Sequence, residues 1–302
     1  MSKTSPAAPV RLHTLLGDYP GTLALKQGAL RSAQVAFDFV DVKPAQNAFK
    51  RVVRELEFDL AELALVTFLM AKAWGKPLVL LPAVLIARFQ HPYLVYNAER
   101  GPLAPGELAG CRVGIRSYSV TTAAWIRGIL ANDYGVDLDR IRWVSFEDAH
   151  VAEHRDPPTV ERAAAGKDAV AMLLAGELDA VVVGNAVPAD ARLQPLIPDP
   201  AAAAADWHRR NGAIQINHMV VVRESLSQSK PQAVREAFRL LQESKQAAGL
   251  PGAGTIDLNP FGVEANRRNL EVAIDYVYQQ RLIPRRFEVD ELFDDVTRAL
   301  GS

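Results

Sequence analysis

The sequence predicts an α/β protein in which mostly parallel sheets are flanked by helices. Short apolar runs alternate along the chain with segments whose apolar residues recur at helical spacing, the pattern of successive strand and helix units. A buried strand, a polar turn and an amphipathic helix follow one another within residues 111–136. The last third of the chain is mainly helical in pattern. With 302 residues and 49% apolar content, the chain can form one large or two medium domains.

The elements of the first half are predicted from apolar runs bounded by turn residues. The predicted strands are residues 10–16, 37–40, 58–65 and 78–86, and the predicted helices are 22–30, 44–56 and 66–74. The run at 58–65 contains Glu62 and is either a strand or a strand leading into a helix. Residues 87–97 are expected to continue as an extended stretch, followed by a Gly- and Pro-rich passage at 99–106.

The second half repeats the alternation before it becomes helical. The predicted strands are residues 112–115, 141–144, 180–183 and 214–222. The predicted helices are 167–174, 201–207, 232–247, 263–280 and 289–300, together with a helix that starts at residue 120 and ends at Gly135. A charged loop at 146–158 carries His150 and His154, which we expect to be solvated rather than metal-binding. Residues 188–200 are expected to form a proline-rich loop.

The turn before the helix that starts at residue 120 is the strongest candidate for a ligand site. A helix amino terminus offers unpaired backbone N–H groups and the positive end of the helix dipole, which together favour an anion. Ser119 is expected to cap the helix. Hydrogen-bond donors gather at this turn: Arg116, Ser117, Tyr118, Ser119, Thr121 and Thr122. The alternative is an ordinary helix whose hydroxyl groups satisfy its own amino terminus.

Composition narrows the classes of function. Lys and Arg total 34 and Asp and Glu total 35, so a net charge of −1 gives no field that favours nucleic acid or an anionic membrane. The single Cys111 excludes an intrachain disulfide and Cys-rich metal sites, and is expected to be a buried, inert thiol in a strand. The first 21 residues lack the apolar core of a secretory signal, and no apolar run reaches the ~20 residues that span a bilayer. We therefore expect a cytoplasmic protein, unless a leader has been removed.

The order of elements resembles the two-lobed periplasmic-binding-protein-like type II fold, and residues 169–184, AVAMLLAGELDAVVVG, resemble its helix-then-strand signature. Four stretches more specifically resemble the 4,5-dihydroxyphthalate decarboxylase family, whose members are cytoplasmic enzymes on that fold. They are residues 58–65 (FDLAELAL), 88–97 (RFQHPYLVYN), 110–136, and 260–293, which begins PFGVEANRRNLEVAIDYVYQQR. The similarity runs from about Leu12 to the carboxyl terminus.

Two departures from the family pattern fall at the expected ligand site. A run of the Phe-Pro-Ser-Arg type leads into the family's Arg-Phe-X-His motif, whereas VLIA at residues 84–87 precedes Arg88. The family's polar turn resembles Pro-Glu-Tyr-Gln, whereas residues 116–119 are RSYS. These differences bear on the substrate more than on the fold.

The resemblance implies two lobes with a ligand cleft between them, a helical carboxyl-terminal part and two crossings of the chain. Lobe 1 is expected to comprise residues 1–95 and 215–302, and lobe 2 residues 96–214. The crossings at 88–97 and 214–222 are expected to bring His91 and His218 close together, an inference from fold analogy.

The resemblance also implies decarboxylation of a hydroxylated aromatic dicarboxylate, most simply 4,5-dihydroxyphthalate to protocatechuate, in the degradation of phthalate. Protonation of the ring carbon that bears a carboxylate, followed by loss of CO2, requires no cofactor or metal. It requires a proton donor, a group that takes the phenolic proton and cations that hold the remaining carboxylate. Histidine suits the first role and arginine the last, because the pKa of histidine lies near neutrality and arginine binds carboxylates bidentately.

His91 is the first candidate for the acid, with Arg88 as a carboxylate clamp, although a straight strand would point these two residues to opposite faces. Pro92 allows a bend. His218 and Glu62 are further catalytic candidates. Tyr19, Arg88, Asn185 and the turn residues 116–119, 121 and 122 are candidate substrate contacts. Each has a structural alternative: His91 and His218 as hydrogen-bonded core histidines, and Glu62 as a helix cap. Trp125 and Arg127 are expected to be packing and surface residues.

Two rival functions remain open. A solute-binding protein for a small carboxylate would bind its ligand without turnover. A relative of the pyrimidine-precursor synthases would need a Cys-rich iron site, against which the lone Cys111 argues. The expected partner is a small aromatic carboxylate, and the helical last third offers surface for a homo-oligomer.

Overall fold

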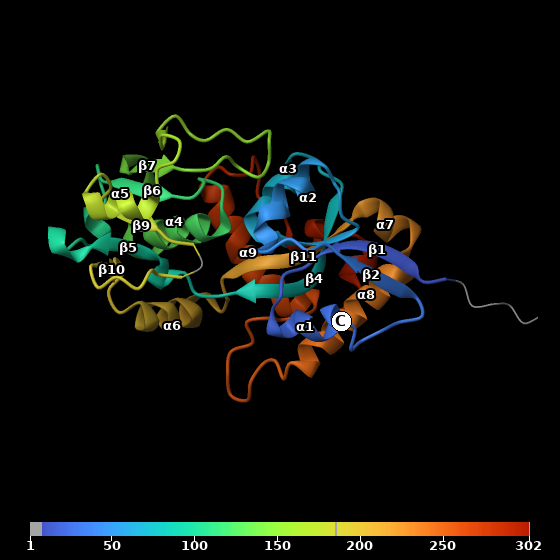
Figure 1. Ribbon diagram of the computed structural model, residues 1–302. Helices are drawn as coiled ribbons and strands as arrows, with labels where there is room; N and C mark the ends of the chain where they lie inside the picture. Colours follow the sequence, from blue (N-terminus) through green and yellow to red (C-terminus); the bar gives the residue numbers. More distant parts are fainter. Residues whose placement is uncertain (1–7, 185, 302) are drawn as a thin grey trace, which may run out of the picture. The chain divides into compact units, whose positions relative to one another are not determined.

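A computed structural model of the protein describes residues 8–184 and 186–301. These residues form two compact units (Figure 1). Unit 1 comprises residues 8–87, 216–268 and 287–301, and unit 2 lies within 88–215 and 269–286. The expectation of a ligand cleft shared by two lobes stays a prediction.

Unit 1 is built on a mixed sheet. Among the described residues its strand order is β2 (Val35–Phe39), β1 (Val10–Leu15), β3 (Leu60–Ala64), β11 (Ile216–Arg223), β4 (Leu78–Ala87). The strands β1, β2 and β3 are parallel, whereas β11 runs antiparallel to both β3 and β4. The late strand β11 is therefore inserted between two strands from the first third of the chain.

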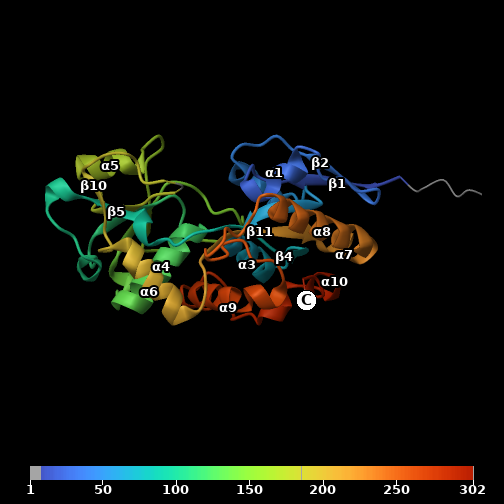
Figure 2. The ribbon, with the colours of Figure 1, turned by 90° about the horizontal axis from the view of Figure 1, so that it is seen from below.

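Helices cover both faces of this sheet. Their bounds are α1 (Pro20–Lys26), α2 (Phe49–Arg54), α3 (Leu65–Ala73), α7 (Glu224–Ser229), α8 (Pro231–Ala247) and α10 (Asp295–Arg298), with 3-10 turns η1 (Ala45–Ala48) and η6 (Val289–Leu292). Figure 1 shows α2 and α3 on one side of the sheet and α1 and α8 on the other. Figure 2 shows α7 and α8 following one another along the sheet.

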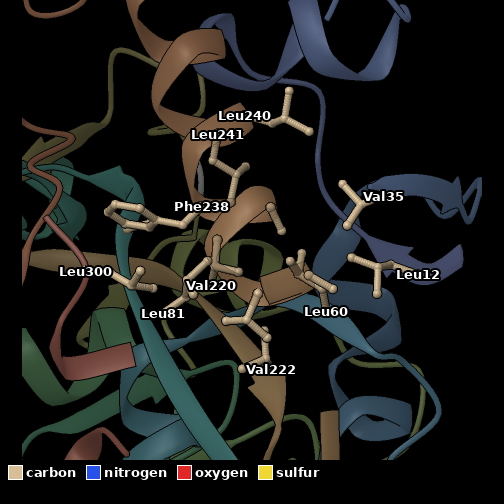
Figure 3. Close-up of a cluster of buried hydrophobic side chains, with 14 of the residues drawn as sticks. Leu12, Val35, Leu60, Leu81, Val220, Val222, Phe238, Leu240, Leu241 and Leu300 are labelled. Carbon is tan, nitrogen blue, oxygen red and sulfur yellow. The ribbon is translucent and has the colours of Figure 1, made fainter. Parts of the chain in front are cut away.

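The core of unit 1 lies between the sheet and α8. Leu12, Leu60 and Val220 from the strands meet Phe238 and Leu241 from the helix (Figure 3). These side chains are at most 3% exposed. Burial of such a side chain contributes about 1.5–3 kcal/mol. The apolar residues whose spacing predicts a helix at 232–247 thus form the face of α8 that packs against the sheet.

Unit 2 contains a second mixed sheet. Within the described residues its order is β10 (Leu193–Pro195), β5 (Leu94–Asn97), β9 (Ala180–Val182), β6 (Arg112–Ile115), β7 (Arg142–Ser145), β8 (Val160–Arg162). The part from β9 to β8 is parallel, and β5 and β10 pair antiparallel. Its helices are α4 (Thr121–Tyr134), α5 (Ala169–Ala175) and α6 (Pro200–Asn211), with short 3-10 turns η2 (His91–Tyr93), η3 (Ala98–Arg100), η4 (Pro105–Glu107) and η5 (Leu138–Arg140).

An aromatic cluster holds α4 in place within unit 2. Helix α9 (Val263–Gln279) begins in unit 1 and ends in unit 2, where it supplies Tyr276. The Trp207 indole N–H donates to the Tyr276 hydroxyl at 3.1 Å, and Trp125 of α4 meets both rings edge to face. A Cβ on Gly128 would lie 1.9 Å from the Tyr276 ring, so this close approach of α4 requires glycine.

Several sequence expectations need correction. The helix expected at residues 289–300 is interrupted, because Phe293 is extended and Asp294 starts a new cap by accepting a hydrogen bond from the Thr297 N–H. The extended stretch expected at 87–97 is broken by the turn η2, which contains Pro92. Strand β10 lies where only a proline-rich loop was expected. Cys111 is half-buried and precedes β6 rather than lying in it. Among the described residues, no helix is long and apolar enough to cross a membrane.

Candidate active site

Glu62 of β3 lies at the centre of a buried hydrogen-bond cluster in unit 1. Its side chain is fully buried. Its Oε2 accepts from the Gly17 N–H at 2.8 Å, and its Oε1 accepts from the Tyr19 hydroxyl at 2.7 Å. The His218 Nδ1 lies 2.5 Å from the same Oε1. Gly17 and Tyr19 of the loop after β1 and His218 of β11 thus converge on one carboxylate.

Strand register explains why His218 reaches Glu62. In the antiparallel pair of β3 and β11, Val220 lies opposite Glu62 and His218 opposite Ala64. His218 is therefore the diagonal neighbour of Glu62 on the same face of the sheet, since alternate residues of a strand share a face. Such diagonal neighbours lie within reach of long side chains. Phe49 of α2 meets the His218 ring edge to face at 5.1 Å between ring centroids.

The hydrogen bonds of this cluster define the state of each member. Burial, reinforced by the charge of Glu62, raises the pKa of Tyr19 well above its ordinary value, so Tyr19 stays protonated and donates. An ionised carboxylate only accepts hydrogen bonds, so a hydrogen bond from His218 to Glu62 in that form requires a hydrogen on Nδ1, and Nε2 is the ring nitrogen not held by Glu62. The His218 side chain keeps 16% exposure, which leaves its ring accessible. The arrangement is a histidine oriented by a carboxylate, the constellation of general acid–base catalysis.

His91, the other histidine candidate, lies in a different environment. It is 1% exposed in η2 of unit 2, its ring meets Trp207 edge to face, and its Nδ1 has no hydrogen-bond partner among the described residues. Burial, with a smaller contribution from Arg210, lowers the pKa of His91 to about 4. The imidazole of His91 is therefore neutral at neutral pH, and its role as the acid stays a prediction.

Arg88 is oriented within unit 2 by backbone and aromatic contacts. Its guanidinium donates to the Gly184 carbonyl and lies 4.2 Å from the centroid of the Tyr93 ring. Burial lowers the pKa of Arg88. Arg88 and His91 were expected to point to opposite faces only if the chain between them were a straight strand. The turn η2 begins at His91, so that condition is not met. Asn185, a further candidate contact, lies outside the described residues.

The amino terminus of α4, at the turn where the sequence predicts an anion site, has no side-chain cap hydrogen bond from its cap residue. The cap is Val120 and not Ser119 as the sequence suggested, and Val120 has no side-chain oxygen to accept from the helix N–H groups. Ser117 is 2% exposed, and its hydroxyl has no partner among the described residues. Ser119 and Thr121 are also buried, and Thr122 is half-buried. Arg116 faces Glu147 at 3.8 Å between Nε and Oε2.

Arg127 is a residue whose importance the sequence did not indicate. It is fully buried in α4, with its guanidinium 3.8 Å from the centroid of the Tyr118 ring. Its Nε donates to the Gln280 Oε1 at 2.8 Å, while both terminal nitrogens lack a hydrogen-bond partner among the described residues. Burial lowers the pKa of Arg127. An arginine on an otherwise apolar helix face was the available signal. The sequence analysis expected Trp125 and Arg127 to be packing and surface residues, and a surface position for Arg127 is wrong because its side chain is fully buried.

Tyr118 and Gln280, which both contact Arg127, also line a cavity of about 460 Å³ in unit 2, together with His154 and Asp156. The His154 Nε2 lies 3.2 Å from the Asp156 Oδ1, and His150 is buried. The expectation that both histidines belong to a solvated loop is therefore wrong.

The mixed sheets flanked by helices, with β11 inserted between β3 and β4, define the class. The fold is that of the periplasmic-binding-protein-like proteins, which confirms the predicted fold class. The alkanesulfonate-binding protein of Xanthomonas axonopodis pv. citri matches 95% of this chain and 99% of its own, with a TM-score of 0.54 and 15% identity. The aliphatic sulphonate binding protein of Escherichia coli matches 95% of this chain and 98% of its own, with a TM-score of 0.52 and 15% identity.

Sequence comparison identifies particular relatives. A 4,5-dihydroxyphthalate decarboxylase of Comamonas testosteroni is 27% identical over 261 residues, which cover 79% of this chain and 76% of the relative. A second, from Pseudomonas putida, is 28% identical over 216 residues, covering 66% of this chain and 82% of the relative. No protein-family model matches the chain. The resemblance to these decarboxylases that the sequence motifs indicate is thus confirmed.

Proposed function

We propose that the protein is a carboxy-lyase that converts 4,5-dihydroxyphthalate to protocatechuate. The similarity to two decarboxylases of that name supports the reaction. The observation that carries the proposal is the buried carboxylate of Glu62 holding His218 by Nδ1, because the reaction needs a positioned proton donor.

The chemistry follows from the substrate. One phenolic oxygen lies para to a carboxylate and pushes electron density into the ring as its proton is withdrawn. The ring carbon bearing that carboxylate takes up a proton. The bond to the carboxylate then breaks, CO2 leaves, and the electron pair of the broken bond restores aromaticity. The phenolic oxygen regains its proton, so the net change is consumption of one proton and release of CO2.

We assign the delivery of the proton to His218. When protonated on both nitrogens, its Nδ1–H donates to Glu62 and its Nε2–H is the one transferred. The carboxylate of Glu62 contacts the His218 Nδ1, whereas the His91 Nδ1 has no hydrogen-bond partner among the described residues and burial lowers the pKa of His91 to about 4. The prediction that His91 is the acid is therefore replaced, in this proposal, by His218.

We assign the binding of a carboxylate to the amino terminus of α4. Its backbone N–H groups and helix dipole favour an anion, and the buried Ser117 hydroxyl is an additional donor without a partner among the described residues. The remaining turn candidates, Arg116, Tyr118, Ser119, Thr121 and Thr122, stay predictions, as do Arg88 and Asn185.

The test is direct. The purified protein is incubated with 4,5-dihydroxyphthalate, with and without EDTA, and protocatechuate is followed by chromatography. We expect turnover in both samples and a loss of about 10²–10⁴-fold in kcat for His218→Asn. His13→Asn is the matched control, because His13 also faces a glutamate, Glu57 at 3.5 Å, but is 44% exposed. Full activity of His218→Asn would overturn the assignment.

The carboxylate site has its own test. Ser117→Ala is expected to raise KM about 5-fold with little change in kcat, corresponding to one lost hydrogen bond of about 1 kcal/mol. Ser227→Ala is the matched control, because Ser227 of α7 in unit 1 is also buried with a hydroxyl that has no partner among the described residues. An unchanged KM for Ser117→Ala would remove Ser117 from the site.

A second candidate function is the binding of a small acid without chemistry. The fold similarity to two sulfonate-binding proteins and the open amino terminus of α4 favour it. The same incubation separates the two functions. Thermal stabilisation by 4,5-dihydroxyphthalate without formation of protocatechuate would support the binding protein and contradict the decarboxylase.

A further inference from the structure

The loop between β1 and α1 is fixed by side chains of the helix that follows it. The Thr22 hydroxyl donates to the Gly17 carbonyl at 2.7 Å and accepts from the Tyr19 N–H at 3.0 Å. The Lys26 ammonium donates to the Leu16 carbonyl at 2.6 Å. Thr22 is fully buried. The backbone of Gly17 and Tyr19 is therefore held in one conformation from the first turns of α1.

Within this loop the Tyr19 ring lies directly against the backbone of Gly17. A Cβ on Gly17 would lie 2.4 Å from the Tyr19 hydroxyl oxygen and 2.5 Å from the ring carbon that bears it. Such distances are far inside van der Waals contact. A side chain at position 17 would therefore displace the Tyr19 ring from the place it occupies. The same residue donates its N–H to the Glu62 Oε2.

Both oxygens of Glu62 are therefore fixed from this loop. Gly17 holds Oε2 and the Tyr19 hydroxyl holds Oε1, and the His218 Nδ1 approaches Oε1. A carboxylate held at both oxygens cannot rotate away from the imidazole. The direction in which Oε1 faces decides which nitrogen of His218 carries the hydrogen when the ring is neutral.

We propose that Gly17 and Tyr19 are positioning residues that act through Glu62 to hold His218 as its Nδ1–H tautomer. In this role Tyr19 does not contact the substrate, which differs from the role that the sequence suggested for it. Gly17 acts twice, by its N–H and by the absence of a Cβ that would displace the Tyr19 ring. The catalytic consequence rests on the proposed decarboxylation, whereas the tautomer does not.

The first experiment measures the tautomer without substrate. In protein labelled with ¹⁵N at histidine, the ring-nitrogen shifts of His218 are recorded at a pH where the ring is neutral, with assignment by comparison with His218→Asn. We expect the Nδ1–H form in the unaltered protein and a mixture with the Nε2–H form in Tyr19→Phe and in Gly17→Ala. An unchanged tautomer in either variant would remove that residue from the role.

Gly21→Ala is the matched control for Gly17→Ala. Gly21 lies four residues further on in α1, and a Cβ there would meet its nearest neighbour, the Leu250 Cδ1, at 3.7 Å, an ordinary contact. We expect this variant to keep the Nδ1–H form. Tyr19→Phe retains the ring and its packing, so it reports on the hydroxyl even if Gly17→Ala folds poorly.

A double-mutant cycle tests the link between the two residues. In a Tyr19→Ser background the ring that a Cβ at position 17 would strike is gone. Gly17→Ala should therefore have a clear effect alone and little additional effect in that background. Equal effects in both backgrounds would show that Gly17 does not act through the Tyr19 ring.

The kinetic readout separates this inference from the proposed function. Tyr19→Phe and Gly17→Ala are each expected to lower kcat about 10–100-fold with KM little changed, as for partners that orient a functional ligand or base. An unaltered protein with no decarboxylase activity but the Nδ1–H tautomer would overturn the proposed function and leave the positioning role intact. An active protein whose variants keep both tautomer and kcat would overturn the positioning role alone.

Discussion

The Nδ1 atom of His218 lies 2.5 Å from the Oε1 of Glu62, although the two residues are 156 positions apart in the chain. The contact joins β11 to β3 across an antiparallel pair, at a point where the carboxylate is fully buried and the imidazole is not. In the proposed reaction, this contact orients His218 as the proton donor.

Glu62→Gln should lower kcat by about 10²-fold while KM changes little, because a neutral amide neither balances an imidazolium nor holds its Nδ1–H as strongly. The measurement is steady-state kinetics of protocatechuate formation. Glu57→Gln is a control, since Glu57 also faces a histidine but lies in a half-exposed ion pair with Arg51. A fall confined to KM would mean that Glu62 binds the substrate instead.

His91 should make the stability of the fold depend on pH. Burial lowers the pKa of His91 to about 4 in the folded protein, so between pH 4 and 6.5 the unfolded chain binds a proton that the folded chain does not. This contribution to stability is fully present above pH 6.5 and is lost as the pH falls toward 4, by about 3 kcal/mol in all. Urea unfolding at several pH values measures it. His91→Phe should flatten the dependence, and an unchanged slope would contradict the assignment.

Val120→Asp should raise the free energy of unfolding and weaken the binding of the substrate carboxylate. An aspartate at the cap of α4 can accept from the helix N–H groups and should raise the free energy of unfolding by about 0.5–2 kcal/mol. Its charge competes for the same N–H groups and repels a bound anion, so KM for the dicarboxylate should rise. Val120→Thr, which can cap without charge, should raise KM less. A stabilised Val120→Asp variant with normal KM would show that the anion binds elsewhere.

Arg127→Met should leave the free energy of unfolding unchanged or raise it, by up to about 1–4 kcal/mol. The guanidinium is fully buried, and its terminal nitrogens have no hydrogen-bond partner among the described residues, so its desolvation is only partly offset by Gln280 and the Tyr118 ring. Chemical denaturation provides the comparison. A loss of more than about 3 kcal/mol would show that the stacked guanidinium supports the fold.

Much of the fold follows from local pattern. The apolar runs predict β1, β4, β6 and β11, and helical spacing predicts α4, α8 and α9, because each of these elements buries one face or both. Elements decided by a single residue escape this reasoning. Pro92 ends the extended stretch at a 3-10 turn, and the Asp294 side chain starts a new cap within an expected helix.

The candidate site was only partly predictable. Glu62, His218 and Tyr19 are notable in the sequence because each is polar within or beside an apolar run, but their mutual contact is not. Nothing in the sequence around Gly17 indicates a role, because the reason for a glycine there is the position of the Tyr19 ring in the folded protein. Arg127 was expected among the packing and surface residues. Its complete burial could not be predicted, because it depends on side chains from distant parts of the chain.

The sequence by itself determined the α/β class, most of the elements and the similarity to 4,5-dihydroxyphthalate decarboxylases, because these depend on periodicity and short motifs. The tertiary structure decided that Glu62 is shared by Gly17, Tyr19 and His218, and that His91 is sealed against Trp207. The contact of His218 with Glu62 depends on β11 entering the sheet between β3 and β4, a long-range pairing whose register is set by the burial of whole faces. The sequence near Glu62 or near His218 does not by itself predict which residues of β3 and β11 lie opposite one another.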